Sequence, residues 1–189
     1  MAVKSLPSDF KQAGVIDLSK NKKQALGVNL LSLVIAILMF SAAWYAEPLS
    51  LALDLNTLIV ALIFVVCLFA YTTLHELTHG LFFRYFSKQK VHYGLTGIYA
   101  YAKSDAYFKK GEYIIIGLAP VVLFFVVFGL LMVFLPQEYF WFVYFLQIFN
   151  ISGAAGDIFM IFHLRKFSKN TLIHDDGAGM KLYEKTNGI

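Results

Sequence analysis

The sequence predicts an all-α, polytopic membrane protein with four transmembrane helices and both termini in the cytosol. Three observations predict this fold class. The mean hydropathy is +0.66, with 59% hydrophobic and only 15% charged residues, far from the values of a soluble domain. Four apolar runs are each long enough to cross a hydrocarbon layer of about 30 Å as a helix. All sixteen Lys and Arg residues fall in segments that this topology puts on one side of the membrane.

The chain begins with a polar segment, residues 1–26, which carries five lysines and lacks an apolar core of its own. We expect a cytosolic lead-in that is partly helical. The first span is the uncharged run 27–46, and the linker 47–56 after it contains neither Lys nor Arg. This linker is therefore expected on the outer side.

The second span starts near residue 55, stays uncharged to residue 74, and continues as a helix to about residue 86. The loop that follows, 87–112, is basic and polar. Within it, residues 91–102 contain strand-forming Tyr, Val and Ile, and Gly94 and Gly97 mark a turn. This pattern indicates a short β-hairpin between the second and third helices.

The third span is the uncharged run 113–135, in which Pro120 removes the hydrogen bond to the Ile116 carbonyl and should kink the helix. The fourth span, 139–163, leads into a basic tail. The expected organisation is a cytosolic N-terminal segment 1–26, a four-helix membrane domain 27–163 with an intramembrane metal site, and a cytosolic tail 164–189. A single cysteine excludes an intramolecular disulfide and a zinc site of the Cys2His2 type.

An H-E-x-x-H pattern, His75 to His79, lies inside the second span. On an α-helix the two histidines project from one face and can bind one metal ion, while Glu76 between them can hold a water beside it. A charged side chain in mid-bilayer costs about 2.5–3.5 kcal/mol, so such a cluster indicates a function. We expect His75 and His79 to be metal ligands and Glu76 to be a general base. The alternative is a pair of core histidines that pack without a metal.

Asp157 is the only charged residue within the fourth span and is the candidate third ligand. At 1.5 Å per residue it lies about 12 Å inside Arg165, while His75 and His79 lie about 13 and 8 Å inside Arg84. The three groups therefore come to nearly the same depth. The alternative is a structural ion pair, or a protonated carboxyl bonded to a neighbouring helix.

A patch of small residues, 152–156, surrounds this carboxylate and would allow close helix packing. Asn150 shares a helix face with Asp157, so it could orient substrate or bond a backbone group near the metal. Its alternative role is to hold helices together. Tyr71 lies one turn before His75 on the same face, where packing is the favoured role over hydrogen bonding to an oxyanion.

These motifs resemble those of a bacterial family described as "putative zincin peptidase", which is related in layout to the site-2 type intramembrane metalloproteases. The resemblance covers roughly residues 60–185. It is carried by H-E-L-T-H-G at 75–80, L-A-P at 118–120, N-x-S-G-A-A-G-D-I at 150–158, and Asp175, Asp176 and Gly177 in the tail. The resemblance implies that His75, His79 and Asp157 bind zinc and that Glu76 is the catalytic base. The chain departs from the site-2 proteases in having four spans and a looser form of N-P-x-x-x-x-D-G.

The leading hypothesis is thus a zinc metalloendopeptidase of the bacterial cytoplasmic membrane, with one Zn2+ ion and a transmembrane or membrane-proximal peptide as substrate. Nucleic acid is not an expected partner, because the basic residues flank the spans. One alternative is a metal carrier or sensor. Transport usually needs polar groups at several depths, whereas here they cluster at one. The other alternative is a non-catalytic accessory membrane protein.

Overall fold

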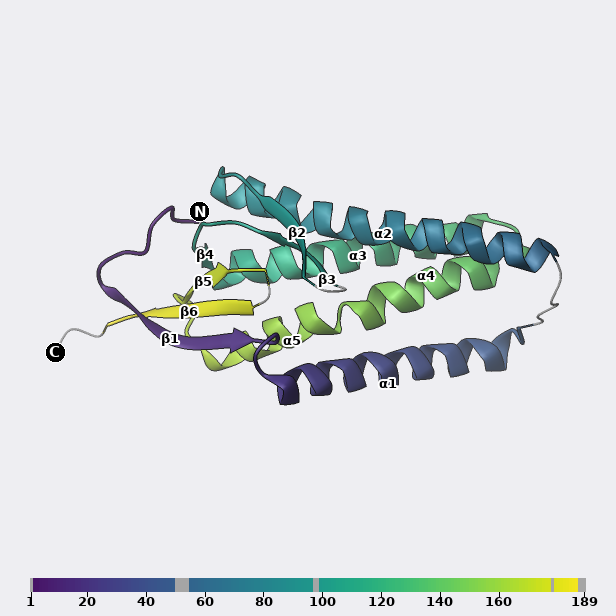
Figure 1. The fold of residues 1–189 in the computed structure, drawn as a ribbon, viewed down its shortest axis with the longest axis horizontal. Helices are drawn as coiled ribbons and strands as arrows, with labels where there is room; N and C mark the ends of the chain where they lie inside the picture. Colours follow the sequence, from purple (N-terminus) through teal and green to yellow (C-terminus); the bar gives the residue numbers. More distant parts are fainter. Residues whose placement is uncertain (1, 50–54, 97–98, 178, 187–189) are drawn as a thin grey trace.

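The computed structural model describes residues 2–49, 55–96, 99–177 and 179–186, and 64% of the residues it describes are helical. Four helical segments of the described chain are long and apolar enough to cross a membrane, which confirms the helical part of the prediction (Figure 1). They are α1 (Lys22–Ala46), α2 (Leu55–Ser87), α3 (Lys110–Phe134), and α4 (Phe140–Gly153) followed by α5 (Ala155–His163). A short 3-10 turn, η1 (Gln137–Tyr139), precedes α4, and another, η2 (Leu164–Lys166), follows α5.

Large apolar side chains cover the outside of this bundle. Leu38 on α1 is 64% exposed, Phe69 on α2 is 72% exposed and Phe134 on α3 is 79% exposed. Apolar surface of this extent drives association in water and is compatible with contact to lipid. The four helical segments are therefore consistent with a multi-pass membrane protein.

A four-stranded antiparallel sheet, which the sequence did not predict, covers one end of the bundle. Its order is β1 (Phe10–Asp17), β6 (Gly179–Lys185), β5 (Leu172–Asp175) and β4 (Phe108–Lys109). The expectation that strands would be confined to one hairpin was wrong. Each strand is short, and β1 and β6 come from opposite ends of the chain, so no local pattern announces their pairing.

Apolar side chains of the sheet form a core to which the N-terminal segment, expected as a polar lead-in, contributes strand β1. Ile16 of β1 is buried, and Met180 and Leu182 of β6 are fully buried. These side chains pack with residues from the ends of α2 and α3, such as Phe83 and Ile116. A second cluster lies deeper in the bundle and includes Tyr71, Phe124, Phe128, Val143 and Leu146. Residues 75–79 of α2 lie between Tyr71, which belongs to the second cluster, and Phe83, which belongs to the first.

The predicted hairpin is confirmed. Strands β2 (His92–Thr96) and β3 (Tyr99–Lys103) pair antiparallel, with Tyr93 opposite Ala102. Gly97, expected in the turn, lies outside the described residues, whereas Gly94 lies within β2 rather than in a turn.

The hairpin packs directly on α2 next to the histidine motif. A side-chain carbon at Gly80, the residue after His79, would collide with the Tyr93 hydroxyl. A glycine is required there because the aromatic ring of β2 approaches the helix backbone so closely. The hairpin is thereby held beside the motif.

The fourth span is broken, contrary to the expected continuous helix. Helix α4 ends at Gly153 and α5 begins at Ala155. Ala154, which lies between the two helices, has a non-helical backbone conformation (φ −77°, ψ 8°). Glycines on both sides of the break weaken helix propensity there. As a result Asp157 lies in the first turn of α5, where free backbone amides and the positive end of the helix dipole favour a carboxylate.

Gly177 in the turn between β5 and β6 allows a specific stability prediction. Its φ is +89°, and a methyl group on it would lie 2.5 Å from Cδ2 of Tyr101. We expect Gly177→Ala to destabilise the protein by about 1–2 kcal/mol from backbone strain alone, and more from the collision. Gly129→Ala on α3 is the matched control, since it has no neighbour within 4 Å. Thermal unfolding in detergent would measure both; equal melting temperatures would contradict the prediction.

Candidate metal centre

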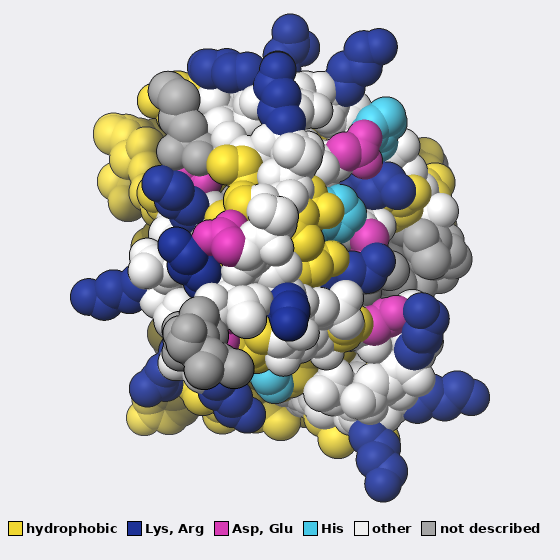
Figure 2. Space-filling model, turned by 90° about the vertical axis from the view of Figure 1, so that its left-hand side faces the viewer, with side chains coloured by type: hydrophobic (Ala, Val, Ile, Leu, Met, Phe, Trp, Pro, Cys, Tyr) yellow, Lys and Arg dark blue, Asp and Glu magenta, His cyan; other side chains and the backbone are white. Residues whose placement is uncertain are grey.

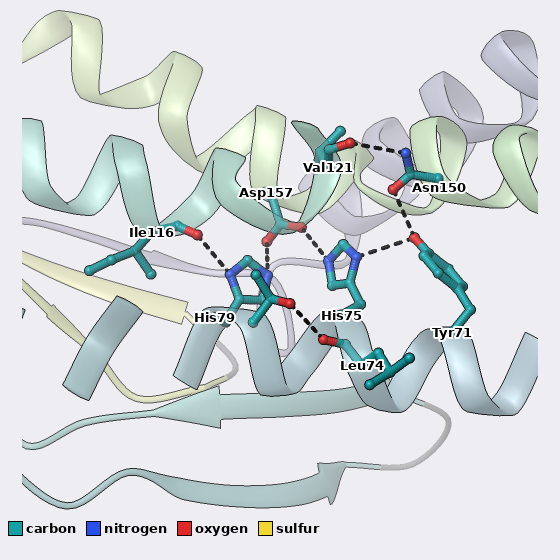
Figure 3. A network of polar contacts seen from close by, with 9 residues as sticks. Tyr71, Leu74, His75, His79, Ile116, Val121, Asn150 and Asp157 are labelled. Atoms are coloured by element: carbon teal, nitrogen blue, oxygen red, sulfur yellow. Dashed lines mark hydrogen bonds and ion pairs between the residues drawn. The ribbon is translucent and has the colours of Figure 1, made fainter. Parts of the chain in front are cut away.

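Three side chains from two helices converge at one level of the bundle (Figure 3). His75 Nε2 lies 3.6 Å from one Asp157 oxygen, and His79 Nε2 lies 3.7 Å from the other. One ligand atom from each residue lies within 4.8 Å of the others. The structure thus brings together all three residues that the sequence offered as ligands.

These distances and atom types fit a zinc ion. Tetrahedral bonds of ~2.0–2.1 Å place neighbouring ligand atoms ~3.3–3.5 Å apart. The two histidine–carboxylate distances of 3.6 and 3.7 Å are only slightly longer than this. Two imidazole nitrogens and one carboxylate oxygen form a donor set that zinc accepts, and three protein ligands leave a fourth position for water or substrate. Both histidines are buried, while Asp157 is half-buried and faces a cavity.

A chain of hydrogen bonds fixes the orientation of His75. The Tyr71 hydroxyl donates to Asn150 Oδ1 at 3.1 Å and lies 3.2 Å from His75 Nδ1. Asn150 Nδ2 in turn donates to the Val121 carbonyl at 3.0 Å. Because the single Tyr71 proton is used on Asn150, His75 Nδ1–H donates to the Tyr71 oxygen. In the neutral imidazole this tautomer leaves the Nε2 lone pair available to bind a metal.

Asn150 and Tyr71 therefore lie next to the candidate ligands. Asn150 is fully buried and reaches His75 through Tyr71. It also connects α4 to α3 through the Val121 carbonyl, so the two roles weighed for it from the sequence are compatible. Tyr71 packs against Phe124 and Phe128 and also hydrogen-bonds, whereas the sequence alone favoured packing.

His79 is oriented by a backbone carbonyl that the helix leaves free. Its Nδ1 lies 2.9 Å from the Ile116 oxygen, and because a carbonyl only accepts, Nδ1 carries the proton. Within α3 the Ile116 carbonyl would normally accept from residue 120, which is Pro120 and has no N–H. The proline thus leaves an acceptor that His79 uses.

This arrangement predicts opposite effects of one substitution on stability and on metal affinity. Pro120→Ala restores an amide that competes for the Ile116 carbonyl, so zinc affinity should fall by about 10–100-fold. The same change removes a helix-interior proline, so the melting temperature of the metal-free protein should not fall. Zinc competition titrations and thermal unfolding would measure the two effects, with Pro136→Ala as the control. Unchanged zinc affinity would contradict the assigned role.

Glu76 lies one residue after His75 and is next to the hairpin. It is half-buried, and the backbone amide of Ala102 on β3 faces its carboxylate. Glu76 lines a cavity of about 110 Å3 together with His79 and Asp157. The predicted base therefore faces the same space as the candidate ligands.

A larger cavity of about 670 Å3 continues from this space. Its wall contains His75, Glu76 and Asp157, and also residues of α1 such as Val28 and Asn29. The candidate metal centre is therefore connected to a groove that could hold several residues of a peptide.

A model of the family described as "putative zincin peptidase" matches residues 68–172, more than half of the chain. The chain belongs to this family. The matched range contains both histidines, Glu76 and Asp157. No curated protein and no solved structure matches the chain. Membership of a zincin family implies zinc, in agreement with the donor set described above.

Two further residues of this zincin-family protein face the cavity and were assigned no role from the sequence. The Tyr113 hydroxyl on α3 donates to Asp175 Oδ2 of β5 at 2.5 Å, and Gly177 N–H donates to Asp175 Oδ1 at 2.7 Å. Burial raises the pKa of the Asp175 carboxyl to about 6, so it is mainly ionised above that pH. Asp175 was noticed in the tail motif, but its approach to α3 depends on the unpredicted sheet.

Proposed function

We propose that this chain is an intramembrane zinc metallopeptidase that hydrolyses peptide bonds of membrane or membrane-proximal substrates. The observation that carries the proposal is the convergence of His75, His79 and Asp157 beside a cavity that Glu76, His79 and Asp157 line. Membership of a zincin peptidase family supports the metallopeptidase class. Four apolar helices support the membrane location.

The residues of the site divide the chemistry between them. A zinc ion held by His75, His79 and Asp157 would supply Lewis acidity, which polarises a water and a carbonyl oxygen. Glu76 takes a proton from the attacking water and later returns it to the leaving nitrogen. Glu76 and Ala102 of β3 line the same cavity, so the carboxylate faces the space in which both transfers take place.

The free edge of β3 supports binding of the substrate as an extended strand. Strand β3 pairs with β2 on one edge, and the Ala102 amide on the other edge points at Glu76. Since outward-pointing groups alternate along a strand, the amide and carbonyl of Ala100 share that edge. Ala100 and Tyr101 line both cavities. An added strand would present its peptide bonds to the site, whereas a helix shields them.

The distribution of charge supports an orientation in the bacterial cytoplasmic membrane. Strands β1 and β6 pair, so both described ends of the chain lie at one end of the bundle (Figure 1). Lys and Arg side chains surround that end (Figure 2). The positive-inside tendency puts this end, with the sheet, in the cytosol. The candidate metal centre then lies within the membrane, a short way from its cytosolic surface.

Removal of the metal tests the proposal directly. We expect purified protein in detergent to contain one zinc per chain and to cleave some members of a panel of quenched, mainly apolar peptides. Treatment with 1,10-phenanthroline should abolish cleavage, and added Zn2+ but not Mg2+ should restore it, because the His2Asp donor set suits zinc. Mass spectrometry and fluorescence would follow metal and cleavage. Cleavage that continues after the zinc has been removed would disprove the proposal.

A further inference from the structure

Asp175 is a carboxylate from the sheet that reaches the candidate active site. It is the last residue of β5, outside the membrane-spanning helices, yet it lines the 110 Å3 cavity with Glu76, His79 and Asp157. None of the described residues that line either cavity is Lys or Arg. A partly buried anion without a basic partner is costly, and this cost indicates a use beyond packing.

The hydrogen bonds of Asp175 define what this wall of the cavity offers to a ligand. The Tyr113 proton is used on Asp175 Oδ2, and Asp175 Oδ1 accepts from Gly177. The Tyr113 oxygen keeps its lone pairs, so both side chains present acceptors to the cavity. An occupant of this position must therefore donate hydrogen bonds or carry positive charge.

We propose that Tyr113 is a further catalytic residue that accepts a hydrogen bond from the leaving nitrogen of the substrate, and that Asp175 positions it. The inference rests on the proposed peptidase function. In the reaction, Glu76 takes one proton from water as the water oxygen bonds to the peptide carbon. The same proton then passes from Glu76 to the nitrogen as the carbon–nitrogen bond breaks. The products are a carboxylic acid and an amine.

Tyr113 and Asp175 act on the departing amine, where positive charge develops. A peptide nitrogen has one N–H and little basicity, whereas the departing nitrogen has two N–H groups and gains positive character as it is protonated. Acceptors fixed beside it, with the Asp175 charge behind them, stabilise the later species more than the bound substrate. The expected contribution therefore appears in kcat rather than in KM.

An ester substrate separates this role from a structural one. The probe is a quenched apolar peptide that the wild type cleaves and Glu76→Gln does not, together with its twin in which oxygen replaces the scissile N–H. The ester leaves as an alcohol, which develops no ammonium charge. We expect Asp175→Asn and Tyr113→Phe to lower kcat for the amide on the order of 10–100-fold, with KM nearly unchanged, and to affect the ester far less.

Two controls make the outcomes distinct. Both variants should keep one zinc per chain and a near-normal melting temperature, and Asp105→Asn, which removes an exposed charge at the same end, should match the wild type. Equal losses on amide and ester, unchanged amide turnover, or loss of zinc would each overturn the assignment. Cleavage by Glu76→Gln would instead overturn the proposed peptidase function itself.

Discussion

Glu76→Gln is expected to abolish peptide cleavage while the protein still binds zinc. Glutamine has nearly the same shape as glutamate and keeps a side-chain oxygen that accepts hydrogen bonds, so the cavity wall should not move. It cannot take a proton from water, and loss of a general base costs about 10²–10⁴-fold in rate. Because Glu76 is not one of the three converging ligand groups, the metal content should stay at one per chain.

The measurement pairs cleavage of a quenched apolar peptide with metal analysis of the same sample. Glu138→Gln in the turn before α4 is a matched control, since it makes the same chemical change at an exposed position far along the chain from the motif. Retained cleavage by the Glu76 variant would show that another group serves as the base. Lost zinc would show that Glu76 is itself a ligand.

The grouping of the candidate ligands could be predicted because it depends on spacing within one helix and on the depth of a residue in another. The i, i+4 separation of His75 and His79 sets a common face without any knowledge of the fold. The depth of Asp157 followed from the positions of basic residues, and the structure brings it to 3.6 and 3.7 Å from the two histidines. Pro120 likewise predicted that the Ile116 carbonyl lacks its helical hydrogen bond. That His79 bonds to this carbonyl could not be predicted from the sequence.

The parts that escaped prediction depend on contacts between distant segments. β1 pairs Phe10 with Lys185, and nothing in either short polar segment identifies the other. The approach of Asp175 to Tyr113 follows from that same sheet. The break at Ala154 was missed for another reason. Small residues in a membrane span are equally consistent with close helix packing and with an interruption of the helix.

The second large effect is expected from removal of a ligand. His79→Ala and Asp157→Ala should each lower zinc affinity by more than the roughly 10–100-fold typical of residues that only orient a ligand. The control is His163→Ala, because His163 Nδ1 hydrogen-bonds the Phe159 carbonyl of its own helix and its ring packs at a tilt against Phe159. Competition with a fluorescent zinc chelator would rank the affinities.

Thermal unfolding provides an independent measure that needs no substrate. A ligand that binds the folded state stabilises it by about 2.7 kcal/mol at a hundred times its dissociation constant, so added zinc should raise the melting temperature of the wild type. The Asp157 variant should lose this rise. An Asp157 that served only as an ion-pair partner would leave the zinc-dependent rise intact after substitution, because both histidines would still bind the metal. That result would remove the third ligand, and with it the open tetrahedral site on which hydrolysis depends.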